Sequence, residues 1–481
     1  MDTLTEHSFN FDFLNALSGD NDGNEKLKTC IQCGSCTASC VASEGMTISP
    51  RRLWRNAQIG MEAETMDSMS YWNCTTCGLC DKRCPRGIPL SRIMLSLRER
   101  YDRAGGAISG VAQTMDNLSK SGNITGDDPS NRLLWLDNLS LSDADRKKLF
   151  RERSEAVYFT GCVGALFPQV GGIPQSLTKL LLMTGADFSL LENEICCGYP
   201  VMAGGKGVGN VKDYALRDIS AIESKGAKTV IVSCPTCYYM FTKVYPELTG
   251  KPLSFEVSHY TEYLSERLGD IGGLGGNTPG DSARGDNASG KKAPGDSASG
   301  DSGKKIVVTY HDPCDLGRKL HITRAPRTLL SGLKGVDFRE TRFSGEESKC
   351  CGGGGNLEMV NPELSRSIAV KRLDEAIETG AEYLLSSCQQ CKRTLQNAAR
   401  AKRARIKVMD LTEFLLARAQ ETQAAQAARE AQAAQEAQAA QAAREAQAAP
   451  TTKEGQAAQV SRESREAPES GESRESREVV K

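Results

Sequence analysis

The chain has 481 residues, of which 60 are Lys or Arg and 61 are Asp or Glu, so its formal net charge is −1. A charge so close to zero gives no general attraction to nucleic acid or to an anionic lipid surface, and we expect no nucleic-acid partner. Hydrophobic residues make up 39% of the chain, below the usual share for a globular protein. This low share indicates that part of the chain does not fold.

No run of about eighteen apolar residues occurs, so the sequence predicts no direct membrane span. The first twenty residues contain no positively charged region followed by an apolar one, and therefore no secretory signal. Thiols that stay reduced for metal binding are typical of the cytosol. We therefore expect a cytoplasmic protein, which a partner could hold at the inner face of the membrane.

Changes in composition divide the chain into segments. The stretch from Gly269 to Gly303 consists largely of Gly, Asp, Ser, Ala and Lys, which is typical of a flexible linker. From Ala417 to Gln459 there is no Leu, Ile, Val, Met or aromatic residue, so this part should not pack. The predicted segments are an N-terminal tail at 1–20, a cysteine-rich helical domain at 21–105, a connector at 106–153, a first lobe at 154–268, a flexible linker at 269–303, a second lobe at 304–416 and a low-complexity disordered tail at 417–481.

Two cysteine runs in the helical domain share the spacing C-x2-C-x2-C-x3-C. They are Cys30, Cys33, Cys36 and Cys40, and Cys74, Cys77, Cys80 and Cys84. Three thiolates on such a tight loop can hold three irons of a cubane 4Fe–4S cluster, while the fourth cysteine binds the partner cluster in two-cluster ferredoxins. We therefore predict two cubane clusters. The predicted ligands are Cys30, Cys33, Cys36 and Cys84 for the first cluster, and Cys74, Cys77, Cys80 and Cys40 for the second.

Zinc is the alternative metal for these motifs. Structural zinc sites take four ligands in two pairs, whereas each run here crowds four cysteines into eleven residues, which favours iron–sulfur clusters.

The remaining ten cysteines form two copies of a longer pattern, a single Cys, then an adjacent pair followed by Gly, then C-x2-C. The copies are Cys162, Cys196, Cys197, Cys234 and Cys237, and Cys314, Cys350, Cys351, Cys388 and Cys391. The first members lie 152 positions apart and the others 154, which indicates a duplication. Five thiolates exceed what a cubane needs, so either one cysteine is spare or the cluster is not a simple cube.

Both lobes alternate β-rich runs with helical patterns. Ala156–Thr160 and Thr229–Ser233 in the first lobe correspond to Ile306–Tyr310 and Tyr383–Ser387 in the second. This alternation predicts α/β lobes with parallel sheets, following an all-α N-terminal part. Four of the cysteines come just after predicted strands, at the sheet edge where open α/β sheets bind ligands.

On these motifs the helical domain resembles the α-helical ferredoxin module of respiratory iron–sulfur proteins. The lobes resemble the CCG domains of heterodisulfide reductases, and the module followed by two lobes resembles the iron–sulfur component of the two-component, membrane-associated heterodisulfide reductases. The resemblance covers roughly residues 25–416 and includes the phrases WNCTTCGLCDKRCPRG and YHDPCDLGRK. It implies that each five-cysteine set binds a non-cubane 4Fe–4S cluster, in anaerobic energy metabolism such as methanogenesis.

The resemblance implies an oxidoreductase that reduces a small-molecule disulfide, the coenzyme M–coenzyme B heterodisulfide, with electrons relayed through the ferredoxin-type clusters. The ten cysteines of the lobes would then form the catalytic site. The same architecture also resembles the electron-transfer components of flavin-dependent glycolate, lactate or glycerol-3-phosphate dehydrogenases. The implied partner is accordingly a membrane cytochrome b-type subunit or a flavoprotein, and motif content does not separate the two functions.

Other polar residues and glycines near the lobe cysteines are candidates for supporting roles. His311, three residues before Cys314, could donate a proton to a departing thiolate, or could be a buried histidine bonded to the backbone. Arg318 and Lys319 could hold an anionic substrate group, or could lie on the solvated surface. The glycine run 352–355 is best explained by close approach of the backbone to a cluster.

Overall fold

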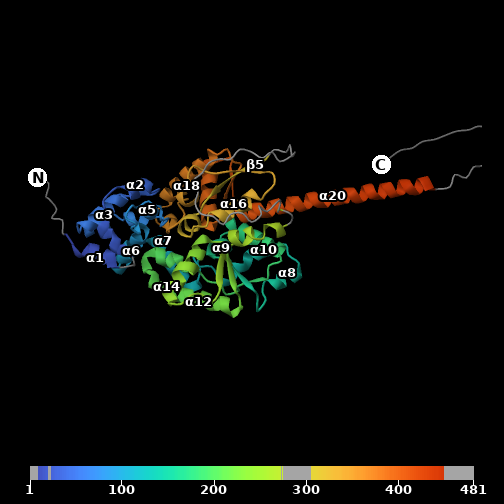
Figure 1. Cartoon of the computed structure of the whole chain (residues 1–481). Helices are drawn as coiled ribbons and strands as arrows, with labels where there is room; N and C mark the ends of the chain where they lie inside the picture. The colour runs from blue at the N-terminus through green and yellow to red at the C-terminus, as the bar shows by residue number, and fades with distance from the viewer. Residues whose placement is uncertain (1–8, 20–22, 272–273, 275–304, 449–481) are drawn as a thin grey trace, which may run out of the picture. The chain divides into compact units, whose positions relative to one another are not determined.

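The computed structural model describes residues 9–19, 23–271, 274 and 305–448 (Figure 1). Most of the predicted linker at 269–303, and the predicted tail beyond residue 448, lie outside the described residues. The chain divides into one unit that ends at Ala425 and another that begins at Gln426. Every cysteine belongs to the first unit.

The N-terminal domain is all helical, as the sequence predicted. It contains α1 (Asp12–Gly19), η1 (Asn24–Thr29), α2 (Ser35–Ser39), η2 (Ser43–Gly45), α3 (Pro50–Gln58), α4 (Glu62–Asp67), η3 (Ser70–Asn73), α5 (Leu79–Lys82) and α6 (Leu90–Arg103). Phe13 and Leu17, four residues apart on α1, are fully buried in the same core as Leu53 and Trp54. The prediction of a tail at 1–20 is therefore wrong for residues 12–19, because this short helix has one apolar face.

The first lobe contains a parallel sheet in the strand order β2-β1-β3-β4. Its strands are β1 (Ala156–Phe159), β2 (Phe188–Leu190), β3 (Thr229–Val232) and β4 (Glu256–His259). The β1 side chains are all buried, as expected for a strand covered on both faces. The main helices of this lobe are α9 (Cys162–Leu166), α10 (Gly172–Met183), α12 (Lys212–Ser224), α13 (Pro235–Tyr239) and α15 (Tyr260–Ser265).

The second lobe repeats this topology, with the parallel order β6-β5-β7-β8. Its strands are β5 (Ile306–His311), β6 (Val336–Arg339), β7 (Tyr383–Ser386) and β8 (Lys407–Asp410). Its helical elements include η10 (Cys314–Lys319), α16 (Arg324–Ser331), α17 (Leu357–Val360), α18 (Pro362–Ile377), α19 (Gln389–Lys402) and α20 (Leu411–Ala448). The predicted fold class, a helical domain followed by two duplicated α/β lobes, is confirmed.

One hydrophobic core joins the two lobes. It contains Tyr158 and Tyr310, from the central strands of the two sheets, and Trp135 from the connector. The connector forms α7 (Ser109–Ser121), η4 (Pro129–Asn138) and α8 (Asp143–Lys148). Ile271 and Leu274 are buried in this core as well, so the prediction that a flexible linker begins at residue 269 is wrong at its start.

The C-terminal prediction also needs correction. Helix α20 continues to Ala448, and Ala419 is fully buried, so the predicted disordered tail is wrong for residues 417–448. The Ala-rich stretch contains neither Gly nor Pro before Pro450, which favours helix. Within the described ranges, no helix has both the length and the apolar character that a membrane span requires.

A single buried arginine on α6 connects the helical domain to both lobes. The Arg98 side chain is completely buried, and its guanidinium donates hydrogen bonds of 2.6–3.2 Å to five main-chain carbonyls. The acceptors are Tyr71, Trp72 and Cys74 in the helical domain, Ala203 in the first lobe and Gly355 in the second. Because these carbonyls come from three parts of the fold, Arg98 fixes how the parts meet.

We predict that Arg98→Leu destabilises the protein by about 3–5 kcal/mol, because it leaves buried carbonyls without a donor. Denaturant unfolding of the anaerobically prepared protein measures the loss. The matched control is Arg103→Ala on the same helix, where the side chain is 63% exposed and pairs with Glu99, so stability should change little. Equal stability of Arg98→Leu and the unaltered protein would show that these contacts do not hold the parts together.

Candidate iron–sulfur sites

All eighteen cysteines fall within the described residues, and all are free thiols. Cys33 is the one exposed thiol among them, while the others are buried or half-buried. Buried, crowded thiols that form no disulfides are expected where a metal group binds, since metals bind the thiolate form. The clustering of free thiols is therefore the first feature that any function has to explain.

The two ferredoxin-type loops share one backbone conformation. Gln32 and Gly34 in the first motif have positive φ values of 60° and 84°, and Thr76 and Gly78 in the second have 54° and 71°. These residues, in the left-handed backbone conformation, turn each loop tightly between successive cysteines. In the second loop the Thr76 N–H donates to the Cys74 sulfur at 3.3 Å. Backbone donors to sulfur are a common feature of iron–sulfur ligation.

The two ferredoxin-type motifs are interleaved. Helix α2, which ends the first motif, packs against α5 of the second. Burial, followed by the neighbouring thiols of Cys74 and Cys77, raises the pKa of Cys40. Burial likewise raises the pKa of Cys74 to about 11, although Arg98 opposes this rise. Cys40 therefore lies near the thiols of Cys74 and Cys77 in the other motif.

The first lobe places its cysteines at the carboxyl edge of its sheet. Cys162 begins α9 after β1, and Cys234 precedes α13 after β3. The sulfur atoms of Cys197 and Cys237 are 3.5 Å apart. Arg132, a connector residue that sequence reasoning missed, donates from Nη2 to the Cys162 sulfur at 3.1 Å.

The charge of Arg132 is balanced by a buried carboxylate. Arg132 Nη1 lies 2.7 Å from Glu194 Oε1, and both side chains are almost completely buried. Glu194 also accepts hydrogen bonds from the backbone N–H groups of Thr160 and Gly161, at 2.7 and 2.8 Å. The pair therefore fixes the loop that leads from β1 to Cys162. No local pattern in the sequence connects Arg132 with this loop.

The second lobe repeats the arrangement with different details. The Cys351 and Cys391 sulfur atoms are 3.2 Å apart. The Gly352 N–H donates to the Cys350 sulfur at 3.4 Å, and the Gly353 N–H donates to the Cys351 sulfur at 3.5 Å. These donors agree with the prediction that the glycines lie close to a cluster.

The same glycine run lets the helical domain approach the second lobe. A Cβ atom on Gly355, where φ is +60°, would lie 2.5 Å from the Cys74 carbonyl oxygen. A Cβ atom on Gly354 would lie 2.8 Å from the Thr75 carbonyl oxygen. Side chains at these positions would therefore push the second ferredoxin-type loop away from the second lobe.

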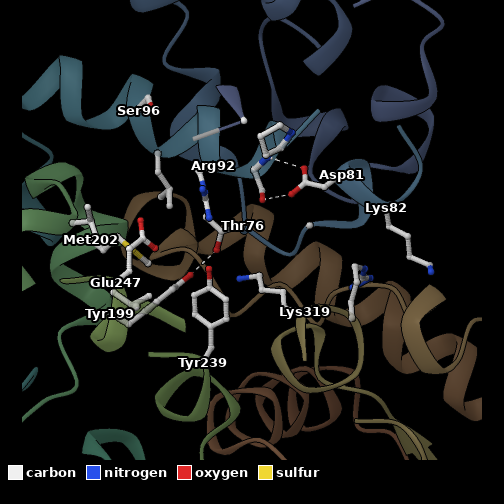
Figure 2. Close-up of a pocket in the computed structure, with 18 of the residues that line it drawn as sticks. Thr76, Asp81, Lys82, Arg92, Ser96, Tyr199, Met202, Tyr239, Glu247 and Lys319 are labelled. Carbon is white, nitrogen blue, oxygen red and sulfur yellow. Dashed lines mark hydrogen bonds between the residues drawn. The ribbon is translucent and has the colours of Figure 1, made fainter. Parts of the chain in front are cut away.

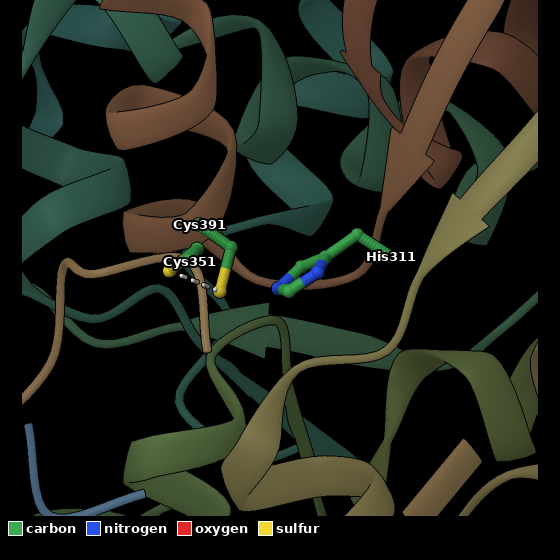
Figure 3. Close-up of side chains that lie close together, drawn as sticks. All are labelled: His311, Cys351 and Cys391. Carbon is green, nitrogen blue, oxygen red and sulfur yellow. Dashed lines mark hydrogen bonds between the residues drawn. The ribbon is translucent and has the colours of Figure 1, made fainter. Parts of the chain in front are cut away.

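His311 lies beside the sulfur pair of the second lobe (Figure 3). One ring nitrogen of His311 and the sulfur atoms of Cys351 and Cys391 all lie within 4.8 Å of one another. The ring is fully buried, and its Nδ1 accepts a hydrogen bond of 3.0 Å from Arg372 Nε. The His311 ring thus bonds to a side chain, and not to the backbone as the alternative supposed.

The sulfur sites adjoin one another across the domain boundaries. A hydrogen bond with Cys350 is the main reason that the pKa of Cys77 is lowered, so the second ferredoxin-type motif touches the second lobe. Cys234 of the first lobe is close enough to Cys388 of the second to interact with it electrostatically. Gln389, next to Cys388, donates to Thr160 O at 2.7 Å and to Ser233 Oγ at 2.8 Å. The sites thus form a continuous series.

A cavity of about 640 Å³ opens where the helical domain meets both lobes (Figure 2). Tyr199 and Thr76, whose hydroxyl groups are 2.5 Å apart, line it together with Tyr239, Arg318 and Lys319. Arg318 is only 5% exposed, and its Nε and Nη1 atoms have no hydrogen-bond partner among the described residues. The surface alternative for Arg318 is therefore wrong.

Lys319 remains a cation in this cavity. Its Nζ lies 2.7 Å from Asp315 Oδ1 and 4.9 Å from the centre of the Tyr239 ring. Burial lowers the pKa of Lys319, but the Asp315 carboxylate raises it well above the ordinary value. A second cavity, of about 140 Å³, is lined by all five cysteines of the first lobe and by Gly353–Gly355 of the second.

The residues of all four sites fit iron–sulfur groups. Crowded thiols, backbone N–H donors to sulfur and the unpartnered His311 Nε2 are features that such groups would satisfy. Four thiols per ferredoxin-type set are sufficient for a cubane, and the five in each lobe provide one more.

Comparisons with known proteins agree with this picture. The model of the cysteine-rich CCG domain matches residues 156–242 and 308–396, and that of the 4Fe-4S dicluster domain matches 26–88. The chain is 29% identical to the D subunit of dihydromethanophenazine:CoB–CoM heterodisulfide reductase from Methanosarcina barkeri, over 81% of this chain and 93% of that protein. It is 24% identical to the B subunit of fumarate reductase (CoM/CoB) from Methanothermobacter marburgensis, over 82% and 73%. It is also 24% identical to EtfAB:quinone oxidoreductase of Syntrophomonas wolfei, over 81% and 58%.

These matches cover the cysteines of all four sets. The chain therefore joins a helical 4Fe-4S dicluster domain to two CCG lobes, and its relatives support an iron–sulfur oxidoreductase. It resembles the iron–sulfur component of heterodisulfide reductase, as its sequence led us to expect.

Proposed function

We propose that this iron–sulfur oxidoreductase reduces a disulfide, and that its substrate is the coenzyme M–coenzyme B heterodisulfide. The observation that carries the proposal is the series of thiol sites, in which Cys77 contacts Cys350 and Cys388 lies within electrostatic range of Cys234. A series that ends in two adjacent five-cysteine sites is suited to a reaction that needs two electrons. The similarity to the Methanosarcina heterodisulfide reductase supports this substrate over other disulfides.

Two cubane and two non-cubane 4Fe–4S groups are the proposed cofactors. The first cubane would be held by Cys30, Cys33, Cys36 and Cys84, and the second by Cys74, Cys77, Cys80 and Cys40. The proximity of Cys40 to Cys74 and Cys77 supports this division. When bound, these groups supply electrons one at a time.

The net reaction breaks one S–S bond, consumes two electrons and two protons, and releases two thiols. The part of the protein is to bind the disulfide, orient it and exclude water. Arg318 and Lys319, which lie four and five residues after Cys314, give the larger cavity two positive groups that suit a substrate with anionic ends. Thr76 and Gly78, on either side of Cys77, line the same cavity.

Electrons would enter at the first ferredoxin-type motif. Cys33 is the exposed thiol of the chain, and Ile31, two residues before it, is 63% exposed. An exposed apolar side chain at a redox site is suited to transient docking of a partner. The donor would be a membrane cytochrome b-type subunit or a flavoprotein. A cytochrome b-type subunit would also hold this chain at the inner face of the membrane.

A second candidate is an electron-transfer component without catalysis of its own. The similarity to EtfAB:quinone oxidoreductase and to the fumarate reductase of Methanothermobacter marburgensis favours it. The flavin-dependent glycolate, lactate and glycerol-3-phosphate dehydrogenases would be its natural counterparts. In that case the lobes would pass electrons between partners, and the isolated chain would not reduce disulfides.

We predict that the anaerobically purified chain contains about sixteen irons and oxidises reduced viologen when the heterodisulfide is added. Iron analysis and loss of viologen colour measure the two properties. Iron without turnover would favour the electron-transfer role, whereas zinc in place of iron would contradict both functions. Cys351→Ala serves as the internal control, since it should reduce turnover by more than about 100-fold and leave the cubane spectrum largely intact.

We also predict that Lys319→Ala raises the KM for an anionic disulfide by about tenfold, because a hydrogen bond to a charged group is lost. The KM for a neutral disulfide, bis(2-hydroxyethyl) disulfide, should stay nearly constant. The matched control is Lys371→Ala, where the side chain is 56% exposed and pairs with Glu44 away from the cavity lining. An equal change for both substrates would mean that Lys319 does not recognise anionic groups.

A further inference from the structure

The two lobes differ at one position that faces their cysteines. His311 is the last residue of β5, three positions before Cys314, and Phe159 is the last residue of β1, three positions before Cys162. The duplicated fold therefore places an apolar ring in the first lobe where the second has an imidazole. Both residues are buried, at 1% exposure or less.

The free nitrogen of the imidazole is directed at sulfur. His311 Nε2 has no hydrogen-bond partner within the described part of the chain, although it is fully buried. Its nearest thiols are those of Cys351 and Cys391, with all three ligand atoms within 4.8 Å (Figure 3). A buried N–H group without a partner is costly, so this placement requires an acceptor in the working protein.

Arg372 determines which ring nitrogen carries the proton. A guanidinium has only donors, so Arg372 Nε, 3.0 Å from His311 Nδ1, requires Nδ1 to be an acceptor. A neutral imidazole whose Nδ1 accepts must carry its proton on Nε2. Nε2 then cannot bind a metal, because the lone pair that a metal would need is replaced by a proton.

The orientation of Arg372 is itself fixed by other side chains. Its Nη1 lies 2.6 Å from Glu375 Oε2, and its Nη2 donates to Thr341 Oγ1 at 3.0 Å. The whole side chain is buried, with 2% of the residue exposed. In the first lobe the position equivalent to Arg372 is Asp218, which accepts a hydrogen bond of 2.7 Å from Tyr245 Oη. The first lobe therefore has neither member of the pair.

We propose that His311 donates its Nε2–H to the Cys351 and Cys391 sulfur pair, that Arg372 holds His311 in this tautomer, and that the bond raises the reduction potential of the second-lobe centre. A donor to sulfur stabilises the more negative, reduced form of an iron–sulfur group. The inference rests on the proposed occupancy of the second lobe by such a group. His311 is thus a donor to the cofactor, and Arg372 is a positioning residue.

The test is an EPR-monitored redox titration of the full-length chain, its His311→Phe, His311→Gln and Arg372→Leu variants, and Cys351→Ala, which identifies the second-lobe signal. His311→Phe copies the first lobe and should shift the second-lobe midpoint to lower potential. His311→Gln keeps an N–H donor and should restore part of the shift. Arg372→Leu removes the group that excludes the other tautomer and should lower the midpoint as well.

The first-lobe signal is the internal control, because it has Phe159 at this position and should not move. The exposed His321, whose Nδ1 lies 2.8 Å from Glu346, provides a second control as His321→Asn. Labelling the histidines with ¹⁵N then distinguishes the bonding mode by pulsed EPR. A hydrogen-bonded His311 gives weak nitrogen coupling and an exchangeable proton, whereas an iron-bound His311 gives nitrogen coupling several-fold larger.

Strong nitrogen coupling, or an unchanged midpoint in His311→Phe with full iron content, would overturn the inference and leave the proposed function standing. A second lobe that binds no iron would overturn both, and iron and sulfide analysis of the unaltered chain shows this directly. The expected result is weak coupling together with a lowered midpoint in His311→Phe and Arg372→Leu.

Discussion

The arrangement of the sulfur sites depends on the buried guanidinium of Arg98. It binds carbonyl oxygens of the helical domain, the first lobe and the second lobe at once, including that of the ligand candidate Cys74. A charged group so far from water is tolerated only where acceptors surround it. This requirement makes the position specific, since the three parts must all be in place before the guanidinium is satisfied. The loop of the second ferredoxin-type motif is consequently anchored on both lobes.

Duplication produced two lobes of the same topology but different chemical surroundings. In the first, the Arg132–Glu194 pair from outside the lobe's own sheet supports Cys162. In the second, Arg372 and His311 lie behind Cys351 and Cys391. Since the polarity near sulfur tunes an iron–sulfur group, two sites with the same ligand pattern need not behave alike. The covalent pattern is repeated, while the electrostatic environment is not.

Much of the fold could be predicted from the sequence because cysteine spacing and alternating strands are local signals. Cys162 and Cys234 after strands, and the glycine run beside Cys351, were correctly placed by such local rules. Contacts between residues far apart in the sequence could not be predicted in this way. Arg132 is 30 positions from Cys162 and sits in a connector without a motif, and Cys77 meets Cys350 only after the domains pack. The packing of Phe13 was missed for a different reason, because a helix of only eight residues gives a weak periodic signal.

The glycines that allow the second ferredoxin-type loop to reach the second lobe also bear on the rate of electron transfer between these two sites. Gly354 and Gly355 leave no room for a Cβ atom against the carbonyls of Thr75 and Cys74. A side chain at either position would push the loop that carries Cys77 away from the lobe that carries Cys350. Electron tunnelling slows steeply as the gap between redox centres widens. In the proposed electron path, two residues without a side chain therefore keep the gap between these two sites short.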